Sequence, residues 1–527
     1  MRINKVTIKN FKNLQNFTIE FDNTSMKTVL LGQNAVGKSN FIEALVLIFK
    51  YLDLSTSSSR EVPPFDYTIN YEIKNNEVNI SCENKKYIIN LNNKLKAETF
   101  NYFFSDEAKK IYQPKYVFTY YSGLSNRLKE HFWKHQEKFY DKITKEDFDD
   151  KELDSLRKLF YVQLVHSYFV LLAYFSFEEE EQESIQFLNE VLNIKDIESI
   201  LFVLKKPTWG DKEKNNDKFW NAKGLVRDFL NYLWDNSLAP MYNQEKIKIN
   251  FKESTEQDRL YLFIKSKKEL QNIANNYESN TEFFKALEST YISKLMEEVR
   301  IKVKKENVDG SITFKELSEG EQQLLTVLGL LKFTKDEDSL ILLDEPDTHL
   351  NPLWKWKYFE YLDKVVKNPD STQLIINTHD PLVIGNLKKE EVRIFKNNKG
   401  KTETYQPEID PRGLGVGGIL TSELFGLPSI LDRDTQKKLN EKRYLQGKLI
   451  RNDINEDELK NYNELKQELE KSGFYEEVED IWFKQYLAEM SKLPIFKKVD
   501  FTNEEQKLLE KESEKVILEI FKSMEES

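Results

Sequence analysis

Hydrophobic and polar positions follow two different periods along the chain. The β-branched apolar run at residues 28–31 predicts a buried strand, and the apolar stretch 40–49 predicts a helix directly after it. Alternating runs predict antiparallel strands at residues 67–73, 78–82 and 87–91, with Asn-rich turns at Asn75-Asn76 and Asn92-Asn93. Further buried strands are predicted at residues 116–121, 339–343 and 373–377. Strands that recur among helices predict an α/β fold with a mixed sheet and an antiparallel subdomain.

The middle and the end of the chain have a different character. From residue 125 to 295 glycine is scarce and charged segments with helical periodicity dominate. We therefore expect a compact helical insertion over 125–295, between an N-terminal lobe at 1–124 and a C-terminal lobe at 296–406. Short strands are expected near 299–303 and 311–314. Residues 407–527 are rich in Lys and Glu and predict a helical tail that docks a partner.

One stretch raises the question of a membrane. Residues 159–177 carry no charged side chain and are long enough to span a bilayer. Gln163, His166 and Ser167 would share one helical face, however, and we interpret the stretch as a buried amphipathic helix. The N-terminus lacks the apolar region of a signal peptide. One cysteine, Cys82, and a net charge of −11 fit a cytoplasmic protein and argue against a chain that coats DNA.

The segment between the first buried strand and its helix predicts a phosphate site. It reads Gly32-Gln33-Asn34-Ala35-Val36-Gly37-Lys38-Ser39, which matches the pattern G-x-x-x-x-G-K-S, and Asn40 follows it. Gly32 and Gly37 permit a tight turn and a close approach to phosphate, and the helix turns its free N–H groups on the anion. Lys38 is expected to reach the β- and γ-phosphates of ATP, and the Ser39 hydroxyl to bind Mg²⁺.

A second buried strand ends in two carboxylates, Asp344 and Glu345. Acids at the carboxyl end of a strand beside a P-loop are placed to hold a metal ion. We expect Asp344 at the Mg²⁺ site. Glu345 is expected to orient and polarise the attacking water, as a general base does.

Two further motifs follow the same logic. Ser318 is a good helix N-cap, Glu321 completes a capping box, and an apolar helix is expected at residues 324–331. Ser318 and the backbone of Gly320 could also form a second anion site at this helix N-terminus. His379 follows the strand at 373–377, and we interpret it as a sensor of the γ-phosphate.

These motifs carry a resemblance to a known group. GQNAVGKS, LSEGEQQ, LLDEPDTHLNP and NTHDP occur in that order after the opening IKNFKNL, and they resemble the ABC-type ATPase heads of the SMC, RecF and OLD group. The resemblance assigns Lys38 to the P-loop, Asp344 and Glu345 to Walker B, and His379 to the switch. It assigns Ser318 and Gly320 to the signature, although Glu319 and Glu321 stand where LSGGQ has Gly and Gln. Gln113 is the candidate for the Q-loop.

The resemblance also implies an assembly. In such heads the signature serves the ATP that the partner subunit holds. We therefore expect a head-to-tail homodimer, or a higher even-numbered homo-oligomer, with ATP and Mg²⁺ at its interface.

Other candidate sites receive structural interpretations. Asp432-Arg433-Asp434 is interpreted as a helix cap rather than a Toprim nuclease site. Asp147-Phe148-Asp149 is a weaker nuclease candidate. His131 and His135 lack the Glu and the third ligand of a zinc site, and Lys129, Lys134 and Lys138 are expected to be solvated. Residues 413–418 contain four glycines and are interpreted as a flexible hinge rather than a dinucleotide loop.

A head with this insertion and a helical tail is similar to the PtuA group, the ATPases of Septu-type and retron-linked anti-phage systems. Residues 418–426 resemble that group's entry into the tail. The resemblance implies a separate HNH nuclease chain, PtuB-like, that the ATPase regulates. Two other functions stay open: a RecF- or SMC-like DNA-repair ATPase that binds DNA itself, and a binding scaffold that ATP locks with negligible turnover.

Overall fold

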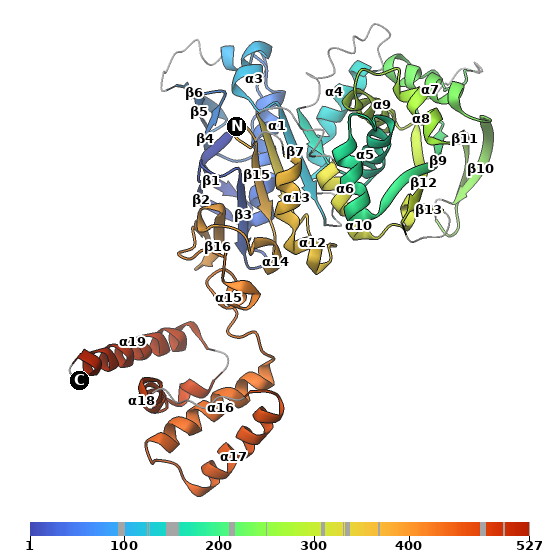
Figure 1. The fold of residues 1–527 in the computed structure, drawn as a ribbon. Coiled ribbons are helices and arrows are strands. Elements are labelled where there is room, and N and C mark those ends of the chain that lie inside the picture. Colours follow the sequence, from blue (N-terminus) through green and yellow to red (C-terminus); the bar gives the residue numbers. More distant parts are fainter. Residues whose placement is uncertain are drawn as a thin grey trace. The chain divides into compact units, whose positions relative to one another are not determined.

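The computed structural model describes residues 1–92, 101–123, 125, 127–143, 158–209, 217–248, 250–306, 311–329, 331, 338–366, 369–474, 481–498 and 501–525. The chain forms two compact units, Met1–Gly413 and Leu414–Ser527. The first unit contains three sheets. Figure 1 gives the element labels that are used below.

The first sheet is antiparallel and belongs to the N-terminal part of the chain. Its order is β2-β1-β4-β5-β6, formed by β1 (Arg2–Phe11), β2 (Leu14–Glu20), β4 (Tyr67–Ile73), β5 (Asn76–Glu83) and β6 (Lys86–Leu91). Its tight turns use residues in the left-handed region, such as Asn75 and Asn84, a conformation that Asn tolerates better than most residues. The predicted strands at 67–73, 78–82 and 87–91 are confirmed.

The second sheet has seven strands in the order β17-β16-β3-β15-β14-β7-β8. All neighbours are parallel except β16 and β17. The strands are β3 (Lys27–Gly32), β7 (Tyr116–Tyr121), β8 (Leu159–Tyr161), β14 (Ser339–Asp344), β15 (Gln373–Asn377), β16 (Val392–Asn398) and β17 (Lys401–Tyr405). The parallel strands place their carboxyl ends at one edge, which is where open α/β sheets bind ligands.

Helix α1 (Lys38–Leu54) joins the two sheets into one core. A single apolar cluster contains side chains of α1, of the antiparallel sheet and of β3, β7, β14 and β15. Every residue from Phe41 to Lys50 is buried, and such an enclosed helix needs apolar residues all round. The P-loop helix is therefore held on several sides.

The third sheet corrects a prediction. Residues 125–295 contain helices, as expected, but they are not helical throughout, because strands of this part and of the chain that follows pair in the antiparallel order β10-β11-β9-β12-β13. The strands are β9 (Ile194–Lys205), β10 (Met241–Lys248), β11 (Ser254–Ile264), β12 (Met296–Lys305) and β13 (Ser311–Thr313). β10 is exposed along its length and carries no apolar alternation, so its sequence gives no strand signal.

Helices pack on this third sheet and on each other (Figure 1). They are η1 (Lys129–Phe132), α4 (Trp133–Ile143), α5 (Val165–Ser176), α6 (Gln182–Leu192), α7 (Gly224–Asn236), α8 (Lys267–Ala274) and α9 (Asn280–Ile292). We call β9–β13 and these helices the middle lobe. The uncharged stretch 159–177 is not one helix, since it begins with β8 and becomes α5 at Val165. No described helix combines the length and the apolarity of a membrane crossing.

Short helices complete the first unit, and longer ones form the second. The first unit contains α3 (Asp106–Tyr112), η3 (Phe314–Glu316), α10 (Glu319–Leu324), η4 (Leu325–Gly329), α12 (Pro352–Trp356), α13 (Tyr358–Val365), α14 (Pro381–Ile384) and η5 (Lys389–Glu391). The second contains α15 (Gly415–Thr421), α16 (Arg433–Ile450), α17 (Glu456–Lys471), α18 (Ile481–Met490), η6 (Pro494–Lys497) and α19 (Asn503–Glu525). The glycine-rich stretch 413–418 contains the boundary between the two units, after Gly413, and its glycines from 415 onward begin a helix.

Candidate nucleotide site

The P-loop is built on two glycines at positions where a side chain would be strained. Gly32 and Gly37 both have positive φ, of 137° and 108°. A Cβ at Gly32 would stand 2.3 Å from the Phe395 carbonyl oxygen, and one at Gly37 would stand 2.8 Å from Leu14. Gly37 is also the N-cap of α1, so the loop and the free N–H groups of the helix face the same space.

Lys38 is buried and folds back over the loop. Its Nζ donates to the carbonyl oxygens of Gly32, at 2.7 Å, and Gln33, at 3.0 Å. Burial lowers the pKa of Lys38 to about 8, and the nearby Asp344 and Glu345 only partly oppose this. An ammonium group that is poorly compensated in a buried place has much to gain from a phosphate.

Three polar side chains meet where β3, β14 and β15 end. Ser39 Oγ donates to Asp344 Oδ1 at 3.2 Å, and the Asn377 amide donates to the same Asp344 oxygen and lies 3.4 Å from Ser39 Oγ. Asp344 Oδ2 and Asn377 Oδ1 are buried and have no hydrogen-bond partner among the described residues. A hydroxyl, a carboxylate and an amide oxygen are ligands that suit Mg²⁺, so these residues fit that ion.

Glu345 and His379 face each other at the same edge. His379 Nε2 lies 3.5 Å from Glu345 Oε1. Burial, followed by the charge of Asp344, raises the pKa of Glu345, whereas burial and then Lys38 lower the pKa of His379 to about 4. His379 is therefore neutral near pH 7. Glu345 has a φ of 53°, an uncommon conformation for a residue with a side chain.

A cavity of about 690 Å³ collects these residues. Of the residues predicted from the sequence, it is lined by Asn34, Ala35, Gly37, Lys38, Ser39, Asn40, Glu345 and His379. Gly32, Val36 and Asp344 lie behind this wall, and Asp344 reaches it through its hydrogen bonds. Ser318 and Gly320 do not line it.

Four lining residues were missed by sequence reasoning: Lys12, Asn13, Arg127 and Asn377. Asn13, at the tip of the β1–β2 hairpin, donates to the Ala35 carbonyl at 2.9 Å and accepts from Asn40 at 2.7 Å. Asn377 ends a buried strand beside Walker B, a position that could have marked it. Nothing in the local sequence distinguishes Arg127 from a surface arginine.

The signature segment packs on the loop that follows Walker B. Ser318 caps α10, and the capping box with Glu321 is confirmed. A Cβ at Gly320 would stand 2.5 Å from the His349 carbonyl oxygen, and Gln323 Oε1 accepts from the His349 backbone N–H at 2.9 Å. Glu321 also accepts from the Ser318 backbone N–H at 2.8 Å, so its carboxylate already holds one donor of this helix end.

Gln113 is not at the nucleotide site. It precedes β7 and donates to the Leu52 carbonyl at 3.3 Å. β7 runs parallel to β14, with Tyr121 opposite Asp344, so Gln113 lies at the other end of the sheet from Walker B. The assignment of Gln113 to the Q-loop is therefore wrong, because a residue that precedes a strand cannot reach the edge where that strand ends.

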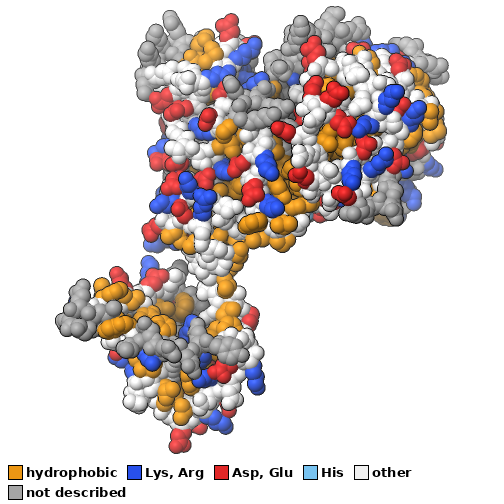
Figure 2. Space-filling model, viewed as in Figure 1, with side chains coloured by type: hydrophobic (Ala, Val, Ile, Leu, Met, Phe, Trp, Pro, Cys, Tyr) orange, Lys and Arg blue, Asp and Glu red, His pale blue; other side chains and the backbone are white. Residues whose placement is uncertain are grey.

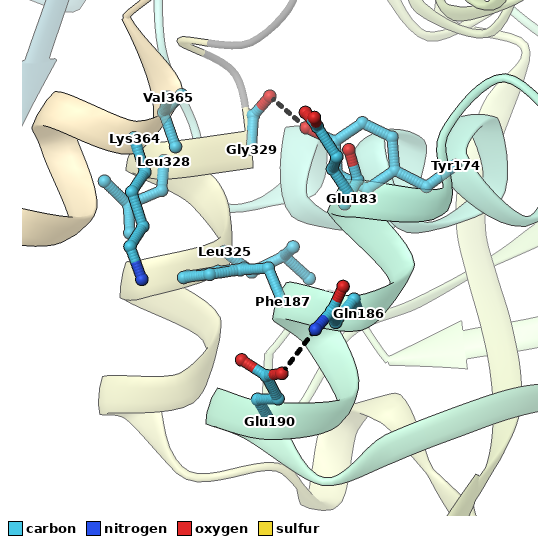
Figure 3. A pocket seen from close by; sticks show the side chains of 11 residues that line it. Tyr174, Glu183, Gln186, Phe187, Glu190, Leu325, Leu328, Gly329, Lys364 and Val365 are labelled. Carbon is cyan, nitrogen blue, oxygen red and sulfur yellow. Dashed lines mark hydrogen bonds between the residues drawn. The ribbon is translucent and has the colours of Figure 1, made fainter.

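A second cavity, of about 340 Å³, lies where the signature segment meets the middle lobe (Figure 3). Leu325, Leu328 and Gly329 of η4 form one wall, and Phe187 of α6 faces them. The Tyr174 hydroxyl donates to the Gly329 carbonyl at 2.9 Å, and a Cβ at Gly329 would stand 2.4 Å from Val170. α5 therefore holds the segment that continues from the signature helix.

The remaining sequence candidates have structural partners. Asp432 caps α16 and accepts from the backbone N–H groups of Asp434 and Thr435, as the helix-cap interpretation predicted. His131 contacts Glu43 at 3.1 Å and His135 contacts Asp53 at 3.0 Å, so both tie the middle lobe to α1. No cluster of three or more His, Cys, Asp and Glu side chains that could hold a metal ion occurs among the described residues, and Asp147 and Asp149 lie outside them.

A P-loop after β3, two carboxylates at the end of β14 and a histidine after the intervening strand β15 define a P-loop nucleotide-binding protein. The chain belongs to the AAA ATPase domain family, whose model matches residues 1–384.

Curated relatives match shorter stretches. The Septu protein PtuA of Bacillus mycoides (strain KBAB4) is 34% identical over 164 residues, which are 29% of this chain and 22% of that protein. The Retron Ec83 probable ATPase of Escherichia coli is 31% identical over 108 residues, 18% of this chain and 19% of that protein. The Retron Vc95 probable ATPase of Vibrio cholerae serotype O1 biovar El Tor is 28% identical over 81 residues, 15% of each chain. The chain thus spans less than a quarter of the length of these relatives.

Solved structures resemble the fold. An SMC head bound to the C-winged helix domain of ScpA aligns with 77% of this chain and 98% of its own length, at 14% identity and a TM-score of 0.33. The recombination mediator protein RecF aligns with 76% of this chain and 97% of its own length, at 16% identity and a TM-score of 0.30.

Proposed function

We propose that the chain binds ATP with Mg²⁺ and hydrolyses it to ADP and phosphate. The observation that carries this proposal is the convergence of Lys38, Ser39, Glu345 and His379 on one cavity, with Asp344 directly behind Ser39. A glycine-rich loop that does not take part in nucleotide hydrolysis would not require two carboxylates and a neutral histidine beside it. Family membership supports the ATP part of the proposal.

Each residue has a task that follows from its surroundings. Lys38 binds the terminal phosphates and the backbone N–H groups of the loop hold the others. Glu345 accepts a proton from the attacking water, and the raised pKa that burial causes makes it a better base than an exposed carboxylate. His379 is neutral and so carries one N–H, which can donate a hydrogen bond either to the Glu345 carboxylate beside it or to the phosphate. Ser39 and Asp344 would hold Mg²⁺, which neutralises phosphate charge.

We further propose a head-to-tail homodimer, or a higher even-numbered assembly, in which Ser318 and Gly320 serve the nucleotide of the partner subunit. Two observations support it: neither residue lines the cavity of its own chain, and Gly320 packs on the loop after Glu345. Closure of the assembly on ATP would complete each site, and hydrolysis would open it.

The proposed output is control of a separate nuclease, of the HNH, PtuB-like kind, in anti-phage defence. The partial matches to the Septu protein PtuA and to two retron ATPases support it. On the face shown in Figure 2, acidic and basic side chains are interspersed over the described surface of the first unit. That mixture favours a protein partner over a long DNA contact as the main target. A cytoplasmic location follows from this role.

Phosphate release by the purified chain with ATP and Mg²⁺ tests the ATPase. Glu345→Gln should bind ATP and lose turnover. If this variant loses turnover and still matches the wild type in every functional assay, turnover is dispensable and the chain acts as a scaffold. ATP-dependent, salt-sensitive affinity for duplex DNA would instead favour a DNA-repair ATPase.

Cleavage of plasmid DNA and tRNA by the chain alone, with Mg²⁺ or Mn²⁺ and with or without ATP, tests the role of a separate effector. We expect no cleavage. Cleavage that disappears in Asp432→Ala/Asp434→Ala would make the tail a nuclease and overturn the proposed partner.

A further inference from the structure

Arg127 lines the nucleotide cavity, although it belongs to none of the nucleotide-binding motifs. It lies between β7 and η1, and its side chain lines the same cavity as Lys38, Ser39 and Glu345. Its positive charge acts on Asp344, where it opposes the rise in pKa that burial causes. Arg127 therefore lies on the side of the cavity where the carboxylates and the terminal phosphate would meet.

A buried carboxylate on the P-loop helix holds Arg127 in place. Glu43 Oε2 accepts from Arg127 Nη2 at 2.6 Å and from its Nε at 3.2 Å, and Nη2 also donates to Asn40 Oδ1 at 2.7 Å. Burial acts to raise the pKa of Glu43, but hydrogen bonds from His131, Lys12 and Arg127 outweigh it and lower the pKa to about 2. Glu43 is therefore an anion at neutral pH.

The charges around Glu43 do not balance. Lys12 Nζ lies 2.5 Å from Glu43 Oε2, so two permanent cations share one carboxylate oxygen. Both cations line the nucleotide cavity. Lys12, Arg127 and Glu43 together carry one net positive charge on that wall of the cavity, and this charge would attract an anion.

The guanidinium is suited to bridge two anions. Arginine presents its donors in a planar fork that can bind a carboxylate on one edge and a phosphate on another. The contacts with Glu43 and Asn40 use Nε and Nη2, which leaves Nη1 without a hydrogen-bond partner among the described residues.

We propose that Arg127 binds the terminal phosphate of ATP and makes the site prefer ATP to ADP, and that Glu43 is its positioning residue. The proposal rests on the proposed ATP site and adds a specificity-determining residue to it. His131 Nε2 of η1 donates to the other oxygen of the Glu43 carboxylate, Oε1, at 3.1 Å, so the positioning carboxylate is fixed from the middle lobe as well.

Nucleotide affinities of the full chain test the proposal. Glu345→Gln serves as the background, so that ATP is not consumed, and ATP and ADP are titrated with Mg²⁺ by calorimetry. Arg127→Gln should lower the ATP affinity about ten-fold or more, because a charge-assisted hydrogen bond is lost, and leave the ADP affinity within about two-fold. Glu43→Gln should lower the ratio of the two affinities less, because Arg127 is kept but loses its anchor.

A control and a second variant keep the test decisive. Lys134→Gln removes the same charge from α4, where Lys134 contacts Glu61 at 2.9 Å, and should leave the ratio unchanged. Equal losses for ATP and ADP in Arg127→Gln, or an unchanged ratio, would overturn the proposal. If Arg127→Gln does not fold, Arg127→Lys is the deciding variant, because an ammonium keeps the charge but lacks the planar set of donors of a guanidinium. A wild-type ratio of ATP affinity to ADP affinity in Arg127→Lys would contradict the proposal. If the background protein binds neither nucleotide, the ATP site itself is refuted, which is a distinguishable outcome.

Discussion

Gly320 lies against the backbone of His349, so closely that a Cβ there would stand 2.5 Å from the His349 carbonyl oxygen. Gly320 belongs to the signature segment and His349 to the loop after Walker B. Gln323 Nε2 also donates to the Tyr120 hydroxyl at 3.1 Å, so the signature helix contacts two strand ends of the nucleotide sheet. A movement of the signature segment would therefore displace residues near Glu345 of the same chain.

We expect Gly320→Ala to lower ATP turnover more than ATP affinity. The added methyl group must displace the loop after Glu345, and overpacking of this kind costs about 1–3 kcal/mol of stability. Gly320 does not line the nucleotide cavity, so binding should persist. Phosphate release and nucleotide titration separate the two effects. Gly417→Ala is the control, because its Cβ would make only ordinary contacts, at 3.5 Å, with Ile430. Loss of affinity equal to the loss of turnover would contradict the argument.

Glu345 should give the turnover rate an acid limb. Its pKa is raised by burial and then by Asp344, so the carboxylate is protonated, and lost as a base, at a higher pH than an exposed glutamate. The rate should therefore fall as the pH drops through that raised pKa. His379, with a pKa lowered to about 4, stays neutral above pH 5 and does not account for such a limb. Glu345→Gln should lower the rate about 100-fold or more and abolish the limb. An unchanged acid limb in this variant would refute the assignment.

Lys38 should couple ATP binding to proton uptake in mildly alkaline solution. Its pKa is lowered to about 8 by burial, and a bound phosphate favours the charged form and raises that pKa. Above about pH 8 the free protein is largely deprotonated at Lys38, so binding takes up a proton and affinity falls as the pH rises. Calorimetry at pH 8.8 in two buffers of different ionisation enthalpy measures the uptake, and pH 7 is the control. Identical apparent enthalpies at pH 8.8 would rule it out.

The nucleotide motifs were predictable because local sequence alone positions them. A glycine loop, a strand end and a helix cap are set by a few neighbouring residues, so Gly37, Asp344 and Ser318 all lie where the pattern indicated. Asn377 could have been added from its place at a strand end. Arg127 could not, because its role depends on Glu43, which is distant in sequence and is itself hidden in an apolar helix.

Three strands of the middle lobe, β9, β10 and β11, were missed for a physical reason, whereas the strands expected near 299–303 and 311–314 are confirmed as β12 and β13. The missed strands mix charged and apolar residues, and β10 is exposed along its length, so no period-two pattern separates it from a solvated helix. The pairing of β9 with β11 and β12 decides the fold there, and such long-range contacts leave little local trace. The prediction for Gln113 was wrong for a similar reason, because it relied on residue type without knowing which end of β7 faces the nucleotide.

The contact between Tyr174 and Gly329 should stabilise the junction of the signature segment with the middle lobe. Tyr174 is buried, and its hydroxyl donates to the Gly329 carbonyl at 2.9 Å. Tyr174→Phe keeps the ring but leaves this carbonyl without that donor, which should cost about 1–3 kcal/mol of unfolding free energy. Urea unfolding measures the loss, and Tyr232→Phe is the control, because its hydroxyl makes no hydrogen bond among the described residues. ATP affinity should not change, since neither tyrosine lines the nucleotide cavity. If turnover falls while ATP affinity holds, the junction transmits the state of the middle lobe to the signature segment. If stability does not change, the hydrogen bond is not formed in solution.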